Sequence, residues 1–192
     1  RQMCIRDSIY NNGTVTLNGG SYIRSQEAGE STSSSGGNSY YNILNHGKMT
    51  INPGVTIYSS GAFSSLIDNG YYSYTTAADK TPNERVNYIQ STGQPNPSLT
   101  IKGGSFSGGI NTIKNDDGAE LTISGGKFSN TTQATVQNNN VAEISGGEFT
   151  PTNSASYAVQ TRYFATAYNK GETKISGGTF NGVMLSLIHI SE

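Results

Sequence analysis

A six-residue motif, Ile-Ser-Gly-Gly-x-Phe, occurs three times in this chain of 192 residues, at 123–128, 144–149 and 175–180. Near-copies stand at 101–106, which reads IKGGSF, and at 17–22, which reads LNGGSY. Self-similarity at a spacing of about 20 to 50 residues is typical of repeat proteins, in which each unit buries its apolar side against its neighbours. The motif therefore predicts a repeat architecture. It leaves the activity open, because no catalytic motif stands out in the sequence.

A second pattern precedes the Gly-Gly pairs: an aliphatic residue, one variable residue and an asparagine. Apolar and polar residues alternate nearby, as in 121–123, so they point to opposite faces of a short strand. Each unit reads as strand, Asn/Gly turn, strand, Gly-Gly bend and a third short strand headed by the aromatic residue. Stacking of such units about 4.8 Å apart would align the asparagines into a side-chain amide ladder. The predicted ladder consists of Asn11, Asn45, Asn69, Asn115 and Asn138.

The aromatic residue of each Gly-Gly motif follows the preceding Ile or Leu by a constant five residues. We therefore predict that these aromatic side chains point into one shared core stack, each close to the next. Each buried Ile or Phe contributes about 1.5–3 kcal/mol to folding. The predicted stack consists of Tyr22, Phe106, Phe128, Phe149 and Phe180.

The composition also favours β structure. The chain has 24 glycines, no tryptophan and only 13% charged residues, and its polar part is mainly Thr, Ser, Asn and Tyr. These residue types suit strands and turns, whereas helix formers are sparse. The net charge is −1, and no basic patch or basic amphipathic stretch predicts binding to nucleic acid or to a membrane surface. A neutral, hydroxyl-rich chain of this kind suits an extracellular location or the cell surface of a bacterium.

Together these patterns resemble the right-handed parallel β-helix family, the pectate-lyase-like solenoids. The resemblance implies an all-β fold, a right-handed parallel β-helix (solenoid) of about six coils with loop insertions. It is nearly silent on activity, since the same fold occurs in lyases, hydrolases, adhesins and phage spikes. An ice-binding array is disfavoured, because we expect the insertions to interrupt the even ranks of threonine that it needs.

The two ends of the chain look foreign to the repeats. Residues 1–8 (RQMCIRDS) and 185–192 (LSLIHISE) resemble peptides translated from sequencing-adapter DNA. We therefore expect a single β-helix domain over 9–184, as a fragment of a longer protein, and terminal segments that lack the repeat register. The alternative is that both segments are native edge strands. Cys4 and His189 lie in these segments.

Three insertions break the repeat, at 23–40, 71–97 and 162–172. We expect the last two to leave the same corner of the coil and to flank a polysaccharide-binding groove, in which tyrosine rings pack on sugar faces and carboxylates bind hydroxyls. The alternative is that the tyrosines cover apolar coil edges and that 115–118 is an ordinary turn. The predicted glycan-binding residues are Tyr71, Tyr72, Tyr74, Tyr88, Tyr163, Tyr168, Asp116 and Asp117.

Enzyme signatures are incomplete. Polygalacturonase-like β-helices combine paired aspartates with Gly-His-Gly and Arg-x-Lys elements, and here only the pair at 116–117 matches. Lys102, Lys114 and Lys127 are expected to stand singly on outward positions. We predict no catalytic residues, metal site or cofactor. The sequence favours a non-catalytic β-helical segment of a large bacterial surface or secreted protein, an adhesin-like stalk or glycan-contacting module whose partner is a polysaccharide or a surface glycan. The alternative is a fragment of a β-helical polysaccharide lyase or glycoside hydrolase.

Overall fold

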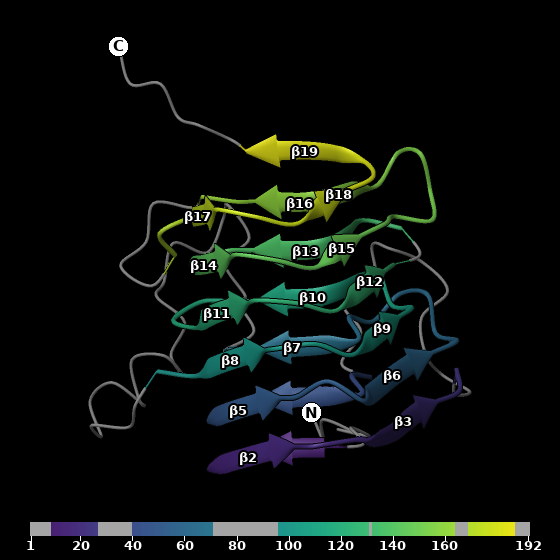
Figure 1. The fold of residues 1–192 in the computed structure, drawn as a ribbon, viewed down its shortest axis with the longest axis vertical. Helices are drawn as coiled ribbons and strands as arrows, with labels where there is room; N and C mark the ends of the chain where they lie inside the picture. Colours follow the sequence, from purple (N-terminus) through teal and green to yellow (C-terminus); the bar gives the residue numbers. More distant parts are fainter. Residues whose placement is uncertain (1–8, 27–39, 71–95, 131, 164–168, 187–192) are drawn as a thin grey trace, which may run out of the picture.

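The computed structural model describes residues 9–26, 40–70, 96–130, 132–163 and 169–186, with only the backbone considered for 183–186. Every regular element in these ranges is a β-strand, and all strands pair in parallel in three stacked sheets (Figure 1). The all-β prediction is confirmed. The same ranges contain no helix long and apolar enough to cross a membrane.

The three sheets run along the length of the molecule, and the chain visits them in the order A, B, C in every coil. Sheet A contains β1 (Ile9–Asn11), β4 (Ile43–Asn45), β7 (Ile67–Asn69), β10 (Asn111–Asn115), β13 (Ala134–Asn138), β16 (Tyr157–Thr161) and β19 (Val183–Ser186). Sheet B contains β2 (Thr14–Leu17), β5 (Lys48–Ile51), β8 (Ser98–Ile101), β11 (Glu120–Ile123), β14 (Val141–Ile144) and β17 (Glu172–Ile175). Sheet C contains β3 (Gly20–Arg24), β6 (Val55–Ser59), β9 (Ser105–Ser107), β12 (Lys127–Ser129), β15 (Glu148–Phe149) and β18 (Thr179–Phe180).

Sheets B and C each have six strands and sheet A has seven, so the chain forms six complete coils and one further strand. Equivalent residues of successive coils lie in register; for example, Ile51 pairs with Ile101, which pairs with Ile123. This arrangement is the right-handed parallel β-helix of about six coils that the repeat predicted.

The Gly-Gly motif makes the bend between sheets B and C, and each glycine is needed for a different reason. A Cβ on Gly125 would lie 2.8 Å from the carbonyl oxygen of Lys102 in the preceding coil, which is too close for any side chain. Gly126 has a φ of +113°, a left-handed conformation that L-residues rarely adopt, and a Cβ there would lie 3.1 Å from the ring of Phe128. Coil stacking and ring packing therefore together require the motif.

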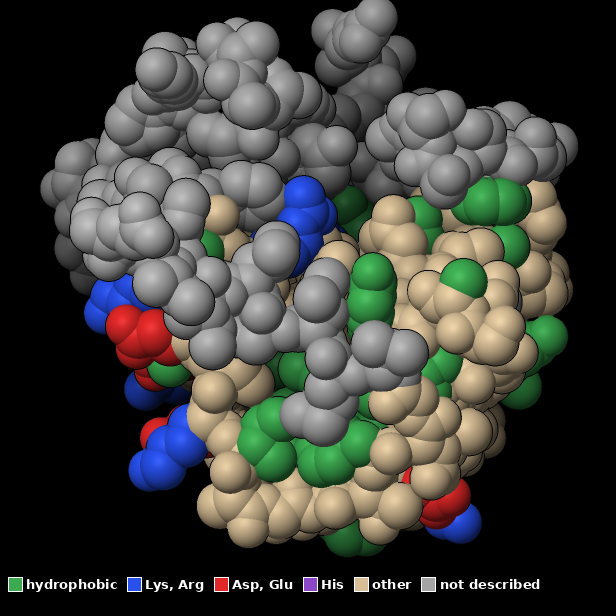
Figure 2. Space-filling model, turned by 90° about the horizontal axis from the view of Figure 1, so that it is seen from above, with side chains coloured by type: hydrophobic (Ala, Val, Ile, Leu, Met, Phe, Trp, Pro, Cys, Tyr) green, Lys and Arg blue, Asp and Glu red, His purple; other side chains and the backbone are tan. Residues whose placement is uncertain are grey.

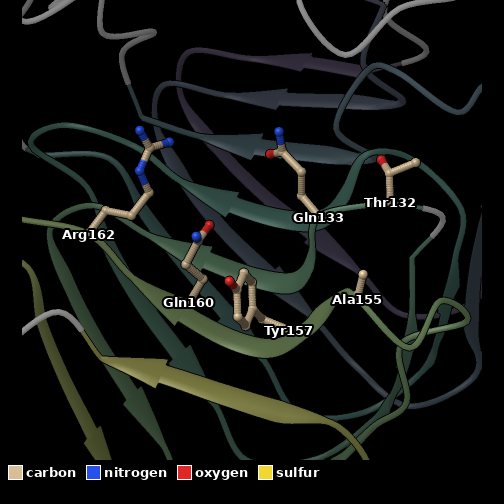
Figure 3. A pocket seen from close by; sticks show the side chains of 6 residues that line it. All are labelled: Thr132, Gln133, Ala155, Tyr157, Gln160 and Arg162. Atoms are coloured by element: carbon tan, nitrogen blue, oxygen red, sulfur yellow. The ribbon is translucent and has the colours of Figure 1, made fainter.

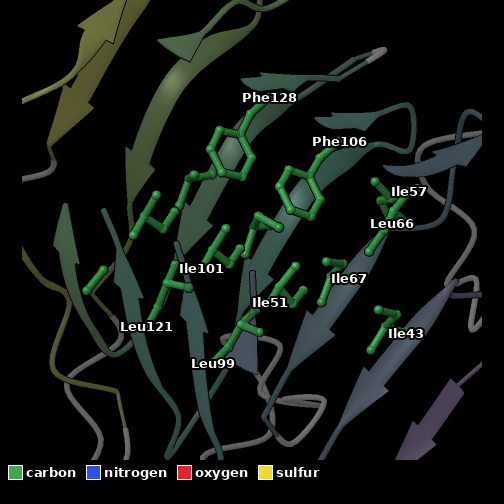
Figure 4. Packing of buried hydrophobic residues seen from close by; sticks show 14 of the residues in the cluster. Ile43, Ile51, Ile57, Leu66, Ile67, Leu99, Ile101, Phe106, Leu121 and Phe128 are labelled. Atoms are coloured by element: carbon green, nitrogen blue, oxygen red, sulfur yellow. The ribbon is translucent and has the colours of Figure 1, made fainter. Parts of the chain in front are cut away.

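The core is a set of aliphatic columns enclosed by the three sheets. Ile51, Ile101, Ile123 and Ile144 occupy one column and are at most 1% exposed. Figure 4 shows side chains from different sheets meeting in this interior, and Figure 2, an end-on view, shows hydrophobic side chains surrounded by polar groups and backbone. Since no single coil could bury these residues, neighbouring coils must fold together.

The two large insertions leave the corner between sheets A and B, as predicted. One connects β7 to β8 and the other connects β16 to β17. The first insertion, at 23–40, begins later than predicted, because Ile23 and Arg24 belong to β3 and pair with Tyr58 and Ser59.

The C-terminal segment departs from one expectation. Leu185 and Ser186 belong to β19 and pair in parallel with Gln160 and Thr161, so the first two residues of 185–192 continue the coil register. The physical reason is that the edge strand β16 offers backbone hydrogen-bonding groups to any extended chain that follows it. Residues 1–8 and 187–192 lie outside the described part of the chain.

Candidate functional site

The predicted groove is only partly visible among the described residues. Tyr71, Tyr72, Tyr74, Tyr88 and Tyr168 lie outside the described ranges. Tyr163 is described and is 45% exposed, a position from which its ring could meet a ligand. The acidic pair at 116–117 lies on the A-to-B corner between the two insertions, at the turn from β10 to β11.

Asp116 and Asp117 are buried, at 0% and 2% exposure, instead of facing solvent as a sugar-binding role requires. The Asp116 carboxylate forms an ion pair with Lys114, with 2.6 Å between Nζ and Oδ2, and accepts a hydrogen bond of 2.9 Å from the Asn139 amide. The Asp117 carboxylate accepts a hydrogen bond of 3.1 Å from the Asn169 amide. Both acids therefore bind groups of neighbouring coils and stabilise the corner.

The expectation that the lysines stand singly is wrong for two of them. Lys114 has a side chain only 15% exposed and is held by its ion pair with Asp116. Lys127, on the outer face of sheet C, forms an exposed ion pair of 3.3 Å with Glu148 on the next coil. For Lys127 the reason is the coil register, which places Glu148 of the next coil beside it. For Lys114 the reason is local, since Asp116 follows it by two residues in the same coil.

Arg162 directly follows β16 of sheet A and lies close enough to Asp116 to interact with its charge. Burial lowers the pKa of its guanidinium from the ordinary value, and the negative charge of Asp116 acts in the opposite direction. Since an arginine stays protonated in proteins even so, Arg162 carries a positive charge at this place.

The asparagine ladder runs through five consecutive coils. Each side-chain amide donates to the side-chain oxygen of the next asparagine, over 2.7 Å in the first three steps and 2.8 Å in the last. The chain of bonds is Asn11 to Asn45 to Asn69 to Asn115 to Asn138. In the sixth coil Thr161 takes the ladder position, and Asn138 donates instead to the Thr173 hydroxyl at 2.8 Å.

The aromatic column contains four stacked rings instead of five. Successive centroids of Phe106, Phe128, Phe149 and Phe180 lie 4.8, 4.8 and 4.9 Å apart with nearly parallel planes. Tyr22 belongs to the same column but is separated from Phe106, because Ile57 occupies the position between them. In that coil Pro-Gly-Val replaces the Gly-Gly pair, which adds one residue and conceals the match in the sequence.

The outer face of sheet B carries an unbroken rank of threonines on four consecutive coils. These are Thr16, Thr50, Thr100 and Thr122. The insertions leave at corners and do not interrupt the rank, contrary to our expectation. Charged residues end it: Glu143 and Lys174 follow in the same column, while Lys48 and Glu120 occupy the neighbouring column. The face is therefore mixed in charge and not a uniform threonine surface.

A cavity of about 360 Å³ opens on the outer face of sheet A. Tyr157 and Gln160 belong to β16, Thr132 and Gln133 directly precede β13, and the labelled side chains project to the same side of the sheet (Figure 3). Its lining residues are Thr132, Gln133, Ala155, Tyr157, Gln160 and Arg162. Sequence reasoning missed this cavity, since its lining residues come from two successive coils and only the stacking of those coils brings them together.

The ranges that the structure describes contain no group of three or more His, Cys, Asp or Glu side chains that could hold a metal ion. No family model, curated protein or solved structure matches the chain.

Proposed function

We propose that this chain is a non-catalytic β-helical segment of a large bacterial surface or secreted protein, and that it acts as an adhesin-like stalk. The supporting observation is continuity. The core columns and the asparagine ladder pass from coil to coil, and both large insertions at the A-to-B corner leave them intact. A repeat solenoid of this kind is extended by adding coils, which suits a structure that holds other groups away from a surface.

The extracellular location is part of the same proposal. Asn, Ser, Thr and Tyr supply most polar groups on the coils, and the net charge is only −1. The likeness to pectate-lyase-like solenoids, through the coil length, the asparagine ladder and the aromatic stack, also belongs to the proposal and concerns architecture instead of chemistry.

Two measurements test the stalk. Recovery of the complete gene should reveal further Gly-Gly-x-Phe coils and a surface-sorting signal. Incubation of the purified chain with plant, algal and bacterial polysaccharides should yield neither new reducing ends nor the ultraviolet absorbance of unsaturated uronates. Turnover of any polysaccharide would refute the non-catalytic role, and a complete gene without additional coils would refute the stalk.

The second candidate is a fragment of a polysaccharide lyase or glycoside hydrolase, and one observation favours it. Acidic and basic groups assemble on sheet A, where Asp68 pairs in register with Lys114, and Lys114 binds Asp116. We rank this candidate second because Asp68 and Asp116 are both 0% exposed and a substrate must reach catalytic groups. Turnover that is abolished by Lys114→Met, in a variant that still folds, would reverse the ranking.

A further inference from the structure

Three side chains at the corner between sheets A and B bring together an amine, a carboxylate and a carboxamide. Lys114 and Asp116 belong to one coil, and Asn139 belongs to the next coil. The Asp116 carboxylate bridges the other two groups: its Oδ2 lies 2.6 Å from Nζ of Lys114, and its Oδ1 accepts a hydrogen bond of 2.9 Å from Nδ2 of Asn139. An amine that can act as a nucleophile and an amide that can be attacked are therefore held on the same carboxylate.

The group is shielded from water and fixed in place by the coil stacking. Asp116 is 0% exposed and Asn139 is 3% exposed, and the side chain of Lys114 is 15% exposed. The backbone N–H of Asn139 donates to the carbonyl oxygen of Asn115 over 2.8 Å, which holds Asn139 against the preceding coil. Groups oriented in this way react as if they were highly concentrated, because the entropy of bringing them together has already been lost on folding.

Two further features favour a reaction at Cγ of Asn139. Within the part of the chain that the structure describes, the buried Oδ1 of Asn139 accepts no hydrogen bond. When Asp116 is protonated, its O–H can donate to this oxygen, which stabilises the negative charge that develops there as Cγ is attacked. Arg162 interacts with the charge of Asp116, so a cation stays beside this carboxylate when Lys114 loses its own charge.

We propose that Lys114 and Asn139 form an intramolecular isopeptide bond, with Asp116 as the proton carrier. Asp116 takes a proton from the Lys114 ammonium group, and the freed lone pair of Nζ attacks Cγ of Asn139. The four-carbon side chain of Lys114 can rotate to bring Nζ from Oδ2 to this carbon.

The atoms balance without any other reactant. Asp116 carries a second proton from Nζ to Nδ2 of Asn139, the bond between Cγ and Nδ2 breaks, and ammonia leaves. The ammonia takes the remaining proton from Asp116 and departs as ammonium, which restores the carboxylate. Nothing is oxidised or reduced. The product is an amide that links two successive coils covalently, and its formation does not depend on the stalk role.

The test is the intact mass of the purified, denatured full chain. The mass should be about 17 Da below the value calculated from the sequence, because one molecule of ammonia is lost. Proteolytic digestion should then yield a branched peptide in which Lys114 is joined to Asn139. Lys114→Arg keeps a cation beside Asp116 but has no primary amine, and it should have its full calculated mass. Asp116→Asn removes the proton carrier and should also have its full calculated mass.

The matched control is Lys127→Arg. Lys127 also forms an ion pair, with Glu148, but both side chains are exposed, so this variant should show the same loss of mass as the parent chain. Circular dichroism must show that each variant folds. The proposal is overturned if the folded parent chain has its full calculated mass, or if Lys114→Arg shows the same loss. A loss of about 18 Da with Lys114 joined to Asp116 would also overturn it, because water and not ammonia would then be the leaving group.

Discussion

The asparagine ladder makes a quantitative prediction at its centre, Asn115→Ala. Asn115 is 0% exposed. Its oxygen accepts a hydrogen bond from Asn69 over 2.7 Å, and its amide donates to the side chain of Asn138 over 2.8 Å and to the backbone oxygen of Val141 over 3.0 Å. The same amide also donates to the backbone oxygen of Ala119 over a longer 3.3 Å. Alanine removes all of these bonds and supplies no replacement.

The expected loss follows from these contacts. A typical internal hydrogen bond contributes about 0.5–1.5 kcal/mol net, so the three shortest of these bonds amount to about 3 kcal/mol. One compensation remains, because the Asn138 oxygen also accepts from the backbone N–H of Asn140 at 3.2 Å. We therefore expect Asn115→Ala to lower the free energy of unfolding by about 2–4 kcal/mol.

Equilibrium unfolding in urea, followed by far-ultraviolet circular dichroism, measures this change, provided that the slope of the transition is unchanged. Asn52→Ala is the control. Asn52 donates to Asn18 over the same 2.7 Å, but this pair lies at the solvent-exposed surface, where water replaces the lost bond. The control should change stability by less than about 0.5 kcal/mol. If Asn115→Ala is no more destabilised than Asn52→Ala, the ladder does not hold the coils together.

Three further changes test the packing with the same urea assay. Gly47→Ala should destabilise the protein strongly, because the added Cβ would collide with the backbone of Gly13 in the preceding coil. Gly13→Ala should be nearly neutral, because the atom nearest to its added Cβ lies 4.0 Å away. Equal effects of the two substitutions would contradict the coil stacking. Phe128→Ala should cost about 3–5 kcal/mol by removing a fully packed ring, and a loss below about 1 kcal/mol would exclude a close-packed stack. Lys114→Met should destabilise by about 2–4 kcal/mol because a buried carboxylate loses its cation, whereas Lys127→Met, in an exposed pair, should change stability by less than about 1 kcal/mol; the reverse order would refute the burial argument.

The fold could be predicted because its determinants are local and repeated. Each Gly-Gly-x-Phe motif carries its own bend and its own ring, so a short stretch of sequence reports the position of a coil corner. The coil with Ile57 escaped this pattern, since Pro-Gly-Val makes the same bend with one more residue. Pro53 and Gly54 are good turn residues, and a search for turn chemistry instead of glycine pairs would have found this coil.

The site could not be predicted in the same way, because its geometry depends on contacts between coils. Asp116 and Asp117 read as an ordinary surface turn, and their burial depends on amides from Asn139 and Asn169, one coil and two coils further on. Two adjacent aspartates in a sequence do not indicate whether their side chains will face solvent or the neighbouring coils. The functional hypothesis placed on these two residues therefore had no local evidence to support or oppose it.

Inward and outward positions of this solenoid carry different information. An inward residue such as Ile123 contacts equivalents in the coils on either side, so the repeat constrains it and it reports only the fold. Outward residues of sheet A follow no such repeat: Asp68, Lys114, Gln137 and Gln160 succeed one another in a single rank. Packing within a coil does not require that variety. All four side chains are polar or charged, and two of them, Asp68 and Gln137, are buried. The rank reaches Gln160, which lines the cavity beside Tyr157, so the outer face of sheet A varies from coil to coil where the interior repeats.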